Sequence, residues 1–296
     1  MSATASTLIT KKRHPLLGTE VRGVDLARPL DRETFREIEA LWLSDLLLVF
    51  PEQRIADEAQ IAFARNFGAL EIHPSVSHRS SRNPEIYRIS NLDERGAVLP
   101  RQSTQWQYME LTRLWHTDSS FREVPSKGSI LHAIELPPEG GDTLFANMYA
   151  AYEALDTETR TRIRGLRVRH SHDHIIRQSE TLSARADKGE YAELPPVVHP
   201  LVQRHPVTGR TSLFLSPHTM EGVEGMPDAD GRALLDALIA HATSGDFTYR
   251  HQWQLDDVIM WDNRCTMHAV IPFDESRHRR ELHRTTLIGD GPPIAA

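Results

Sequence analysis

The chain of 296 residues contains a single cysteine, Cys265, so no disulfide can form within it. A chain without disulfides fits a reducing compartment. The sequence also lacks a run of 18 apolar residues, which excludes a membrane-spanning helix. Residues 1–18 lack the apolar core of a signal peptide. We therefore expect a cytoplasmic protein without a membrane partner. Nothing in the sequence pairs Cys265 with an activating base, so we expect a buried core residue there.

An excess of basic residues is absent as well. The 34 Lys and Arg residues are outnumbered by 41 Asp and Glu residues, which gives a net charge of -7. This balance provides no attraction for a nucleic-acid backbone or an anionic membrane, although a local basic patch could still bind a small anion. Internal repeats, low-complexity tracts and obvious linkers are also missing. We predict one domain over residues 1–296, with loose ends at about 1–12 and 291–296.

The regular alternation of strand and helix that is typical of a doubly wound fold is missing. Helical patterns occur at residues 31–43, 57–68 and 228–243. Short strand patterns, several of them separated by turn residues, occur at residues 46–50, 128–136, 211–216, 247–253 and 257–261. This organisation predicts a mainly β protein with helical insertions. The architecture that we favour is a jelly roll.

The first two predicted helices carry local start signals. Asp31 directly precedes the first apolar stripe and can cap that helix. Asp57 and Gln60 have the spacing of a capping box at the start of the second helix, and Gly68 is suited to end it. We therefore predict that Asp57 takes part in capping.

The segment RLWHTDSSF, residues 113–121, places His116 and Asp118 two residues apart. Such residues point to the same face of a strand, so both could bind one ion. His268, which follows an apolar strand, is our candidate for a third ligand. Two histidines and one carboxylate on one face of an ion suit iron(II) in non-haem oxygenases. The alternative is a pair of polar residues on an ordinary strand, and the spacing alone leaves both interpretations open.

Four segments of the chain extend the evidence beyond the pair His116 and Asp118. They are LWHTDSSF (114–121), LPPEGGDTLFANMYAAYEAL (136–155), MWDNRCTMH (260–268) and RRELHRTT (279–286). In order and spacing they resemble the iron(II)- and 2-oxoglutarate-dependent dioxygenases of the taurine dioxygenase / 2,4-dichlorophenoxyacetate dioxygenase family. The resemblance runs from about Gly18 to about Gly291. It implies a double-stranded β-helix, which is a form of jelly roll.

The resemblance also implies roles for the candidate ligands. His116, Asp118 and His268 would bind iron(II), with 2-oxoglutarate as the cosubstrate and dioxygen as the oxidant. Ascorbate is expected to support the reaction. Halogenating relatives have Ala or Gly in place of the carboxylate, so Asp118 indicates hydroxylation.

The segment RRELHRTT places Arg280 and Arg284 four residues apart, which puts both on one face of a strand. A guanidinium can grip a carboxylate with two hydrogen bonds, and a bond to a charged group contributes roughly 1.5–3 kcal/mol. By resemblance, Arg280 and Thr143 would hold the distal carboxylate of 2-oxoglutarate, and Arg284 the acidic group of the substrate. The loop 270–278 is one residue longer than expected in close relatives, which leaves Arg279 as an alternative clamp.

Aromatic residues near these motifs allow two interpretations. Trp253 occupies a position where the family often has an aromatic beside the cosubstrate, and core packing accounts for it equally well. Trp115 and Trp261 flank the candidate ligands, and we expect them to wall the site.

The alternation of His170, His172 and His174 would place three imidazoles on one face of a strand, where they could bind a soft divalent ion. We favour instead a segment that covers the pocket.

The substrate is predicted to be a small organic anion, because Arg284 would bind its acidic group. Several segments resemble the phenoxyacetate enzymes, including the one in which His218 matches a pocket histidine. His73, in contrast, lies where the taurine enzymes carry a substrate-binding histidine. We predict hydroxylation of an aryloxyalkanoate such as 2,4-dichlorophenoxyacetate, with release of a phenol, succinate and carbon dioxide. The alternatives are an alkylsulfonate dioxygenase that releases sulfite and a noncatalytic jelly-roll binding protein. By analogy alone, a homo-oligomer is an open alternative to a monomer.

Overall fold

The computed structural model describes residues 8–73, 78–183 and 194–296. Within these ranges, no helix combines the length and the apolar character needed to cross a membrane.

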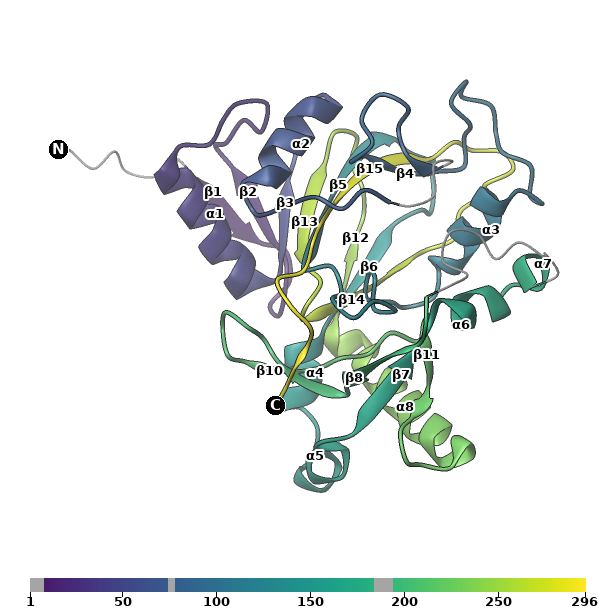
Figure 1. The fold of residues 1–296 in the computed structure, drawn as a ribbon. Coiled ribbons are helices and arrows are strands. Elements are labelled where there is room, and N and C mark those ends of the chain that lie inside the picture. The colour runs from purple at the N-terminus through teal and green to yellow at the C-terminus, as the bar shows by residue number, and fades with distance from the viewer. Residues whose placement is uncertain (1–7, 74–77, 184–193) are drawn as a thin grey trace.

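A seven-stranded sheet forms the centre of the molecule (Figure 1). Its strands, in spatial order, are β1 (Ile9–Lys12), β2 (Thr19–Arg22), β3 (Leu47–Phe50), β13 (Val258–Asp262), β5 (Gly128–Glu135), β15 (Glu281–Leu287) and β4 (Tyr87–Ser90). All neighbours are antiparallel except β2 and β3, which run parallel. Strand β15, from near the C-terminus, thus lies inside the sheet, between two strands from the first half of the chain.

A smaller sheet lies against one face of the large one. It consists of β12 (Thr248–His251), β6 (Thr143–Asn147) and β14 (Thr266–Val270). Strand β13 shows how the sequence divides its two faces, because side chains alternate along a strand. Trp261 points inward and packs with Phe145 of β6 and Leu282 of β15. The intervening Met260 points outward into a different core cluster.

Two helices cover the outer face of the large sheet, α1 (Arg32–Asp45) and α2 (Asp57–Arg65) (Figure 1). Trp42 of α1 and Phe63 of α2 are both buried against it. Full burial of an apolar side chain of this size stabilises the fold by roughly 1.5–3 kcal/mol. The carboxylate of Asp31 accepts hydrogen bonds from the first-turn N–H groups of α1, so the predicted cap is confirmed.

The predicted capping role of Asp57 is wrong. Ala56 occupies the N-cap position of α2 and makes no side-chain capping bond. The Asp57 carboxylate accepts instead from Nδ1 of His283, 2.6 Å away. His283 also lies 3.1 Å from Glu281, so one imidazole bridges two carboxylates on the outer face of β15. The helix ends at Arg65, before Gly68.

His283 makes the stability of the fold depend on pH. Burial lowers its pKa, but the hydrogen bonds to Asp57 and Glu281 outweigh burial and raise the pKa to about 9. A raised pKa means that the protonated imidazole stabilises the fold fully at pH values below its ordinary pKa near 6.5. This stabilisation is lost as the pH rises past 9. We expect the free energy of unfolding to fall by roughly 3 kcal/mol between pH 6.5 and 9.5. Chemical denaturation across this range measures it, and His283→Gln should flatten the dependence. An equally steep fall in that variant would contradict the assignment.

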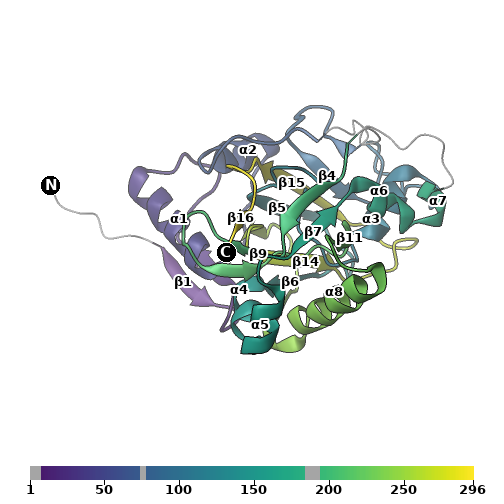
Figure 2. The ribbon, with the colours of Figure 1, turned by 60° about the horizontal axis from the view of Figure 1, so that its bottom comes forward.

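A further layer packs below the small sheet (Figure 2). It contains the helices α4 (Met148–Glu153), α5 (Thr157–Ile163) and α8 (Asp228–Ala242). Its strands form two small sheets, β11 (Met220–Val223) with β7 (Arg167–His170) and β8 (Val197–Pro200), and β10 (Thr211–Leu213) with β9 (Val202–Arg204) and β16 (Ile294–Ala295). A short 3-10 turn, Gly245–Phe247, leads into β12. Leu235 of α8 and Met267 of β14 share one core cluster, which fixes this layer to the small sheet.

The chain ends are less loose than predicted. Strand β1 lies within the predicted N-terminal tail and pairs along its length with β2. Strand β16 lies within the predicted C-terminal tail and pairs with β9. The side chains of both strands are exposed, so their sequences carry no apolar pattern, and backbone pairing places them in the sheets. Residues 1–7 lie outside the described ranges.

Three short helices gather at one end of the sandwich, α3 (Thr104–Leu111), α6 (His172–Arg177) and α7 (Glu180–Ser183) (Figure 1). Ile175 and Ile176 of α6 pack with Leu111 of α3 and Leu182 of α7. The alternative that we did not favour, three histidines on one strand face, does not occur, because β7 ends at His170 and α6 begins two residues later.

Candidate active site

Strand β14 and the segment that follows α3 bring the candidate ligands together. His116 and His268 form an isolated antiparallel bridge in which each backbone N–H donates to the other carbonyl over 2.9 Å. One ligand atom from each of His116, Asp118 and His268 lies within 4.8 Å of the others. The Nε2 atoms of the two histidines lie 4.0 Å from different oxygens of the Asp118 carboxylate. All three residues are buried.

The two imidazoles are neutral and correctly turned to bind a metal. Nδ1 of His116 lies 2.8 Å from the carbonyl of Leu114 and donates to it, which leaves the Nε2 lone pair facing Asp118. Burial lowers the pKa of His116, and lowers the pKa of His268 well below its ordinary value. The ring of His268 lies 4.8 Å from Trp261 and 6.1 Å from Phe145, measured between centroids. These aromatic neighbours restrict its rotation.

Asp118 is held as an anion. Burial raises its pKa, but the charge of Arg284 and a hydrogen bond from Ser129 outweigh burial and keep the pKa well below the usual range. Nη1 of Arg284 donates to Oδ1 over 2.9 Å, and Oγ of Ser129 donates to Oδ2 over 2.9 Å. Two neutral imidazoles and one carboxylate form a donor set that suits iron(II).

Arg280 is a buried cation between the two sheets. Its side chain is 2% exposed, and its Nε donates to the carbonyl of Gly141 over 3.0 Å. Its Nη2 atom has no hydrogen-bond partner among the residues that the structure describes. Burial lowers its pKa from 12.5 to about 10. Gly141 has a φ of +71°, and a Cβ there would lie 3.0 Å from Nε of Arg280, so the guanidinium requires a glycine beside it.

Arg279 faces the opposite way and already has partners. Its Nε donates to Glu135 over 2.6 Å, and its Nη1 donates to the carbonyl of Gly96 over 2.7 Å. It is exposed at the surface. Of the two neighbouring arginines, only Arg280 presents a guanidinium to the interior.

Thr143 and Trp253 lie in the same part of the sandwich as Arg280. Nε1 of Trp253 donates to Oγ1 of Thr143 over 3.0 Å, and both residues are buried. Thr143 follows Gly141 by two residues and begins β6. The structure therefore brings the three residues predicted for the cosubstrate into one region behind the ligand triad.

A cavity of about 380 Å³ opens beside the triad. His116, Asp118 and Arg284 line its inner end. Apolar and aromatic side chains from α3, α6, α7 and the segment after Asp118 line one wall, namely Tyr108, Met109, Phe121, Ile175, Ile176 and Leu182. This is the size and the mixture of walls that small-molecule sites usually have.

Both histidines predicted to contact substrate line this cavity. The ring of His218 lies 5.3 Å from that of His116, and its buried Nε2 has no hydrogen-bond partner within the described ranges. Burial lowers the pKa of His218 well below its ordinary value, so this imidazole is neutral. The ring of His73 lies 4.4 Å from Tyr87, whose face carries the guanidinium of Arg284 at 4.7 Å.

Several residues at the site were missed or misplaced by the sequence reasoning. Ser129 is a polar residue directly before the apolar pair Ile130 and Leu131 of β5, and that contrast could have marked it. Asn263 lies inside a motif that we quoted, yet we gave it no role. Trp115 does not line the cavity but packs against the cluster below the small sheet. Trp261 stands beside His268 as expected, and Cys265 is buried as predicted.

Comparison with known proteins decides the family. Residues 9–286 match the profile of the family described as "Taurine catabolism dioxygenase TauD, TfdA family". The chain belongs to this family. It is 40% identical to the alpha-ketoglutarate-dependent 2,4-dichlorophenoxyacetate dioxygenase of Cupriavidus pinatubonensis, over 96% of this chain and 98% of the relative. It is 36% identical to the (S)-phenoxypropionate/alpha-ketoglutarate-dioxygenase of Sphingobium herbicidovorans, over 92% of both chains.

A solved structure supports the same conclusion. The crystal structure of AAD-2 in complex with Mn(II) and N-oxalylglycine matches with a TM-score of 0.87 and 38% identity, over 97% of this chain and 100% of that chain. The predicted jelly-roll fold and family are thereby confirmed. The protein is a dioxygenase that uses iron(II) and 2-oxoglutarate (α-ketoglutarate) with a small substrate and dioxygen. The roles of individual site residues stay predictions.

Proposed function

We propose that this protein hydroxylates an aryloxyalkanoate such as 2,4-dichlorophenoxyacetate and thereby releases a phenol, succinate and carbon dioxide. One observation carries the proposal, namely that the cavity beside the triad combines the cation Arg284 with a largely apolar and aromatic wall. Such a cavity suits a molecule with a carboxylate at one end and a ring at the other. Hydroxylation of the carbon that bears the aryloxy group gives a hemiacetal, which breaks down to the phenol and a 2-oxo acid.

His116, Asp118 and His268 would hold iron(II). When bound, iron(II) and 2-oxoglutarate supply the chemistry that activates dioxygen and inserts one oxygen atom into a C–H bond. The residues orient the reactants for this step. The neutral imidazoles and the anionic carboxylate leave one side of the triad open toward the cavity. The apolar wall keeps water away from the carbon to be oxidised.

Arg280 would hold the distal carboxylate of 2-oxoglutarate, with Thr143 as a second donor and Trp253 as a wall. The free Nη2 atom of a fully buried guanidinium supports this role, because a buried cation without an anion is costly until an anion arrives. The surface partners of Arg279 argue against the alternative clamp.

Arg284 would bind the carboxylate of the substrate, and His218 and His73 would contact its polar atoms. The position of Arg284 between Asp118 and the ring of Tyr87 supports this role, since it fixes the guanidinium at the inner end of the cavity. A carboxylate bound there would place the adjoining carbon near the triad.

Two other functions are weaker. His73 lines the cavity, as a taurine dioxygenase would require, but taurine has no ring to contact the apolar wall. A noncatalytic binding protein would not need a complete set of three ligands with fixed imidazoles.

We also propose that residues 1–296 form a single cytoplasmic domain. Homo-oligomerisation stays an expectation by analogy.

A side-by-side assay tests the proposal. The protein is supplied with iron(II), ascorbate, 2-oxoglutarate and dioxygen, together with 2,4-dichlorophenoxyacetate, both phenoxypropionate enantiomers or taurine. We expect kcat/KM for the best aryloxyalkanoate to exceed that for taurine at least about 30-fold, because burying the ring contributes roughly 2–3 kcal/mol. Phenol and succinate should form in equal amounts. Faster release of sulfite would favour the sulfonate reaction, and no substrate-stimulated succinate would favour a binding protein.

A further inference from the structure

Asn263 connects the turn after β13 to the backbone of Asp118. Its Oδ1 accepts from the backbone N–H of Asp118 over 2.9 Å, and its Nδ2 donates to the carbonyl of Asp118 over 3.0 Å. The second Nδ2 hydrogen goes to the carbonyl of Ser126, 2.7 Å away. The side chain is 1% exposed. One buried amide therefore binds both backbone polar groups of a single residue.

Asp118 needs such support because the regular pairing of its segment stops before it. His116 still pairs with His268, but no strand continues to Asp118. Ser119, the next residue, has a φ of 56°, in the left-handed region that residues other than glycine rarely adopt. The carboxamide of Asn263 takes the place of a neighbouring strand. A buried backbone group left without a partner usually destabilises a protein noticeably.

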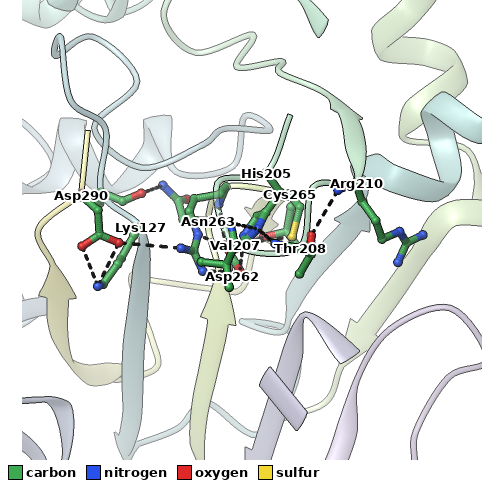
Figure 3. A network of polar contacts seen from close by, with 12 residues as sticks. Lys127, His205, Val207, Thr208, Arg210, Asp262, Asn263, Cys265 and Asp290 are labelled. Carbon is green, nitrogen blue, oxygen red and sulfur yellow. Dashed lines mark hydrogen bonds and ion pairs between the residues drawn. The ribbon is translucent and has the colours of Figure 1, made fainter. Parts of the chain in front are cut away.

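The turn that carries Asn263 is itself firmly anchored (Figure 3). The Asp262 carboxylate accepts from Nε and Nη2 of Arg264 over 2.8 and 2.7 Å, and from Nε2 of His205 over 3.0 Å. The backbone N–H of Asn263 donates to the carbonyl of Lys127 over 3.1 Å. These hydrogen bonds hold the turn in place and so fix the position of the Asn263 amide beside Asp118.

The same anchor explains a second cluster of ligand-type atoms. His205, Asp262 and Cys265 bring such atoms within 4.8 Å of one another. Nδ1 of His205 accepts from the backbone N–H groups of Val207 and Thr208, so the proton lies on Nε2 and is donated to Asp262. Burial raises the pKa of the Cys265 thiol well above its usual value. Both imidazole nitrogens of His205 therefore have hydrogen-bond partners. The cluster stabilises the turn that carries Asn263.

We propose that Asn263 is a positioning residue for the metal site. It fixes the backbone of Asp118 and hence the direction in which the carboxylate faces His116 and His268, without contacting the metal. This inference rests on the proposed role of Asp118 as a ligand. Residues that orient metal ligands commonly change metal affinity by 10- to 100-fold when mutated, by the general behaviour of such sites.

The test compares Asn263→Ala and Asn263→Asp with Asn147→Ala. Asn147 is a matched control, because it is also a buried amide whose Oδ1 accepts from two backbone N–H groups and whose Nδ2 donates to a carbonyl. None of its partners belongs to the triad. Mn(II) affinity is measured by electron paramagnetic resonance titration of the full chain without 2-oxoglutarate, and thermal unfolding is recorded for the same samples.

We expect both Asn263 variants to bind Mn(II) roughly 10- to 100-fold more weakly than the wild type. Asn263→Asp should be the worse, because its carboxylate faces the carbonyls of Asp118 and Ser126. Asn147→Ala should lose thermal stability and keep Mn(II) affinity within twofold. Folded Asn263 variants with unchanged Mn(II) affinity would overturn the proposal and leave a purely structural residue.

Two further results keep the outcome decisive. If the alanine and aspartate variants do not fold, Asn263→Ser, which keeps one polar atom, is titrated in the same way, and unchanged affinity there counts against the proposal. A wild-type protein that binds no Mn(II) would reject the metal site itself, and the role of Asn263 with it. Wild-type binding combined with unaffected Asn263 variants rejects only the positioning role.

Discussion

Asp118→Asn is expected to lower kcat/KM for the aryloxyalkanoate at least about a thousandfold, equivalent to about 4 kcal/mol of transition-state stabilisation. Asp118 is the one anion among the three candidate ligands, since burial keeps both histidines neutral. An amide has the same shape but lacks the negative charge that attracts a divalent ion. Asparagine is preferable to alanine, because its amide oxygen can still accept the hydrogen bond from Arg284, which alanine cannot.

The measurement is substrate-stimulated succinate together with Mn(II) affinity. Asp45→Asn serves as the matched control. Asp45 is also a buried carboxylate with hydrogen-bonded partners, Thr19 and Lys12, but it lies at the end of α1 on the outer face of the large sheet. The control should lose stability and keep its turnover number. Turnover of Asp118→Asn within tenfold of the wild type would remove Asp118 from the ligand set.

The fold class and the location of the site could be predicted from the sequence, because both depend on local patterns and quoted motifs. Strand periodicity identified β5 and β13, and the spacing of His116 and Asp118 placed them together. The pairing of His116 with His268 spans about half the chain, and no local pattern encodes it. Only the family resemblance connected the two.

Two of the errors share one physical cause, which is that a distant partner overrides a local signal. Asp57 has the spacing of a capping residue, but His283 on β15 takes its carboxylate. The chain ends are polar and exposed, yet backbone pairing orders β1 and β16. The choice between Arg279 and Arg280 depends on which side chain faces inward. Because the loop 270–278 differs in length from that expected in relatives, the sequence alone does not fix which of the two does.

The charges at the site explain why both arginines are tolerated there. Arg284 and Asp118 neutralise each other, and Arg280 is left as a buried cation. With a divalent ion bound, the positive charges of the ion, Arg280 and Arg284 exceed the negative charge of Asp118. The excess equals the negative charge that 2-oxoglutarate, a dicarboxylate, and a monoanionic substrate carry together. If Arg280 and Arg284 hold the two reactants as proposed, binding of both would complete the charge balance of the pocket, and the ligand-free protein would carry the electrostatic penalty.

Arg280→Met is consequently expected to have opposite effects on stability and on function. Burial has lowered the pKa of Arg280 to about 10, which corresponds to roughly 3 kcal/mol of unfavourable burial at about 1.4 kcal/mol per pKa unit. Loss of the hydrogen bond from this charged group to Gly141 offsets roughly 1.5–2 kcal/mol of this. The ligand-free variant should be more stable than the wild type by about 1–2 kcal/mol. Its KM for 2-oxoglutarate should rise at least about 30-fold, since a charged hydrogen-bonded pair is lost.

Chemical denaturation and initial rates test both halves, with Arg279→Met as the matched control. Arg279 pairs with Glu135 at the surface, where solvent screens an ion pair, so this variant should stay near the wild type in both measurements. Adding 2-oxoglutarate should raise the unfolding midpoint of the wild type and of Arg279→Met, but not that of Arg280→Met. If Arg279→Met loses affinity for 2-oxoglutarate while Arg280→Met keeps it, the two roles are exchanged. If Arg280→Met is less stable than the wild type without ligand, the buried guanidinium stabilises the fold. That result would contradict the prediction that it destabilises the fold until an anion binds.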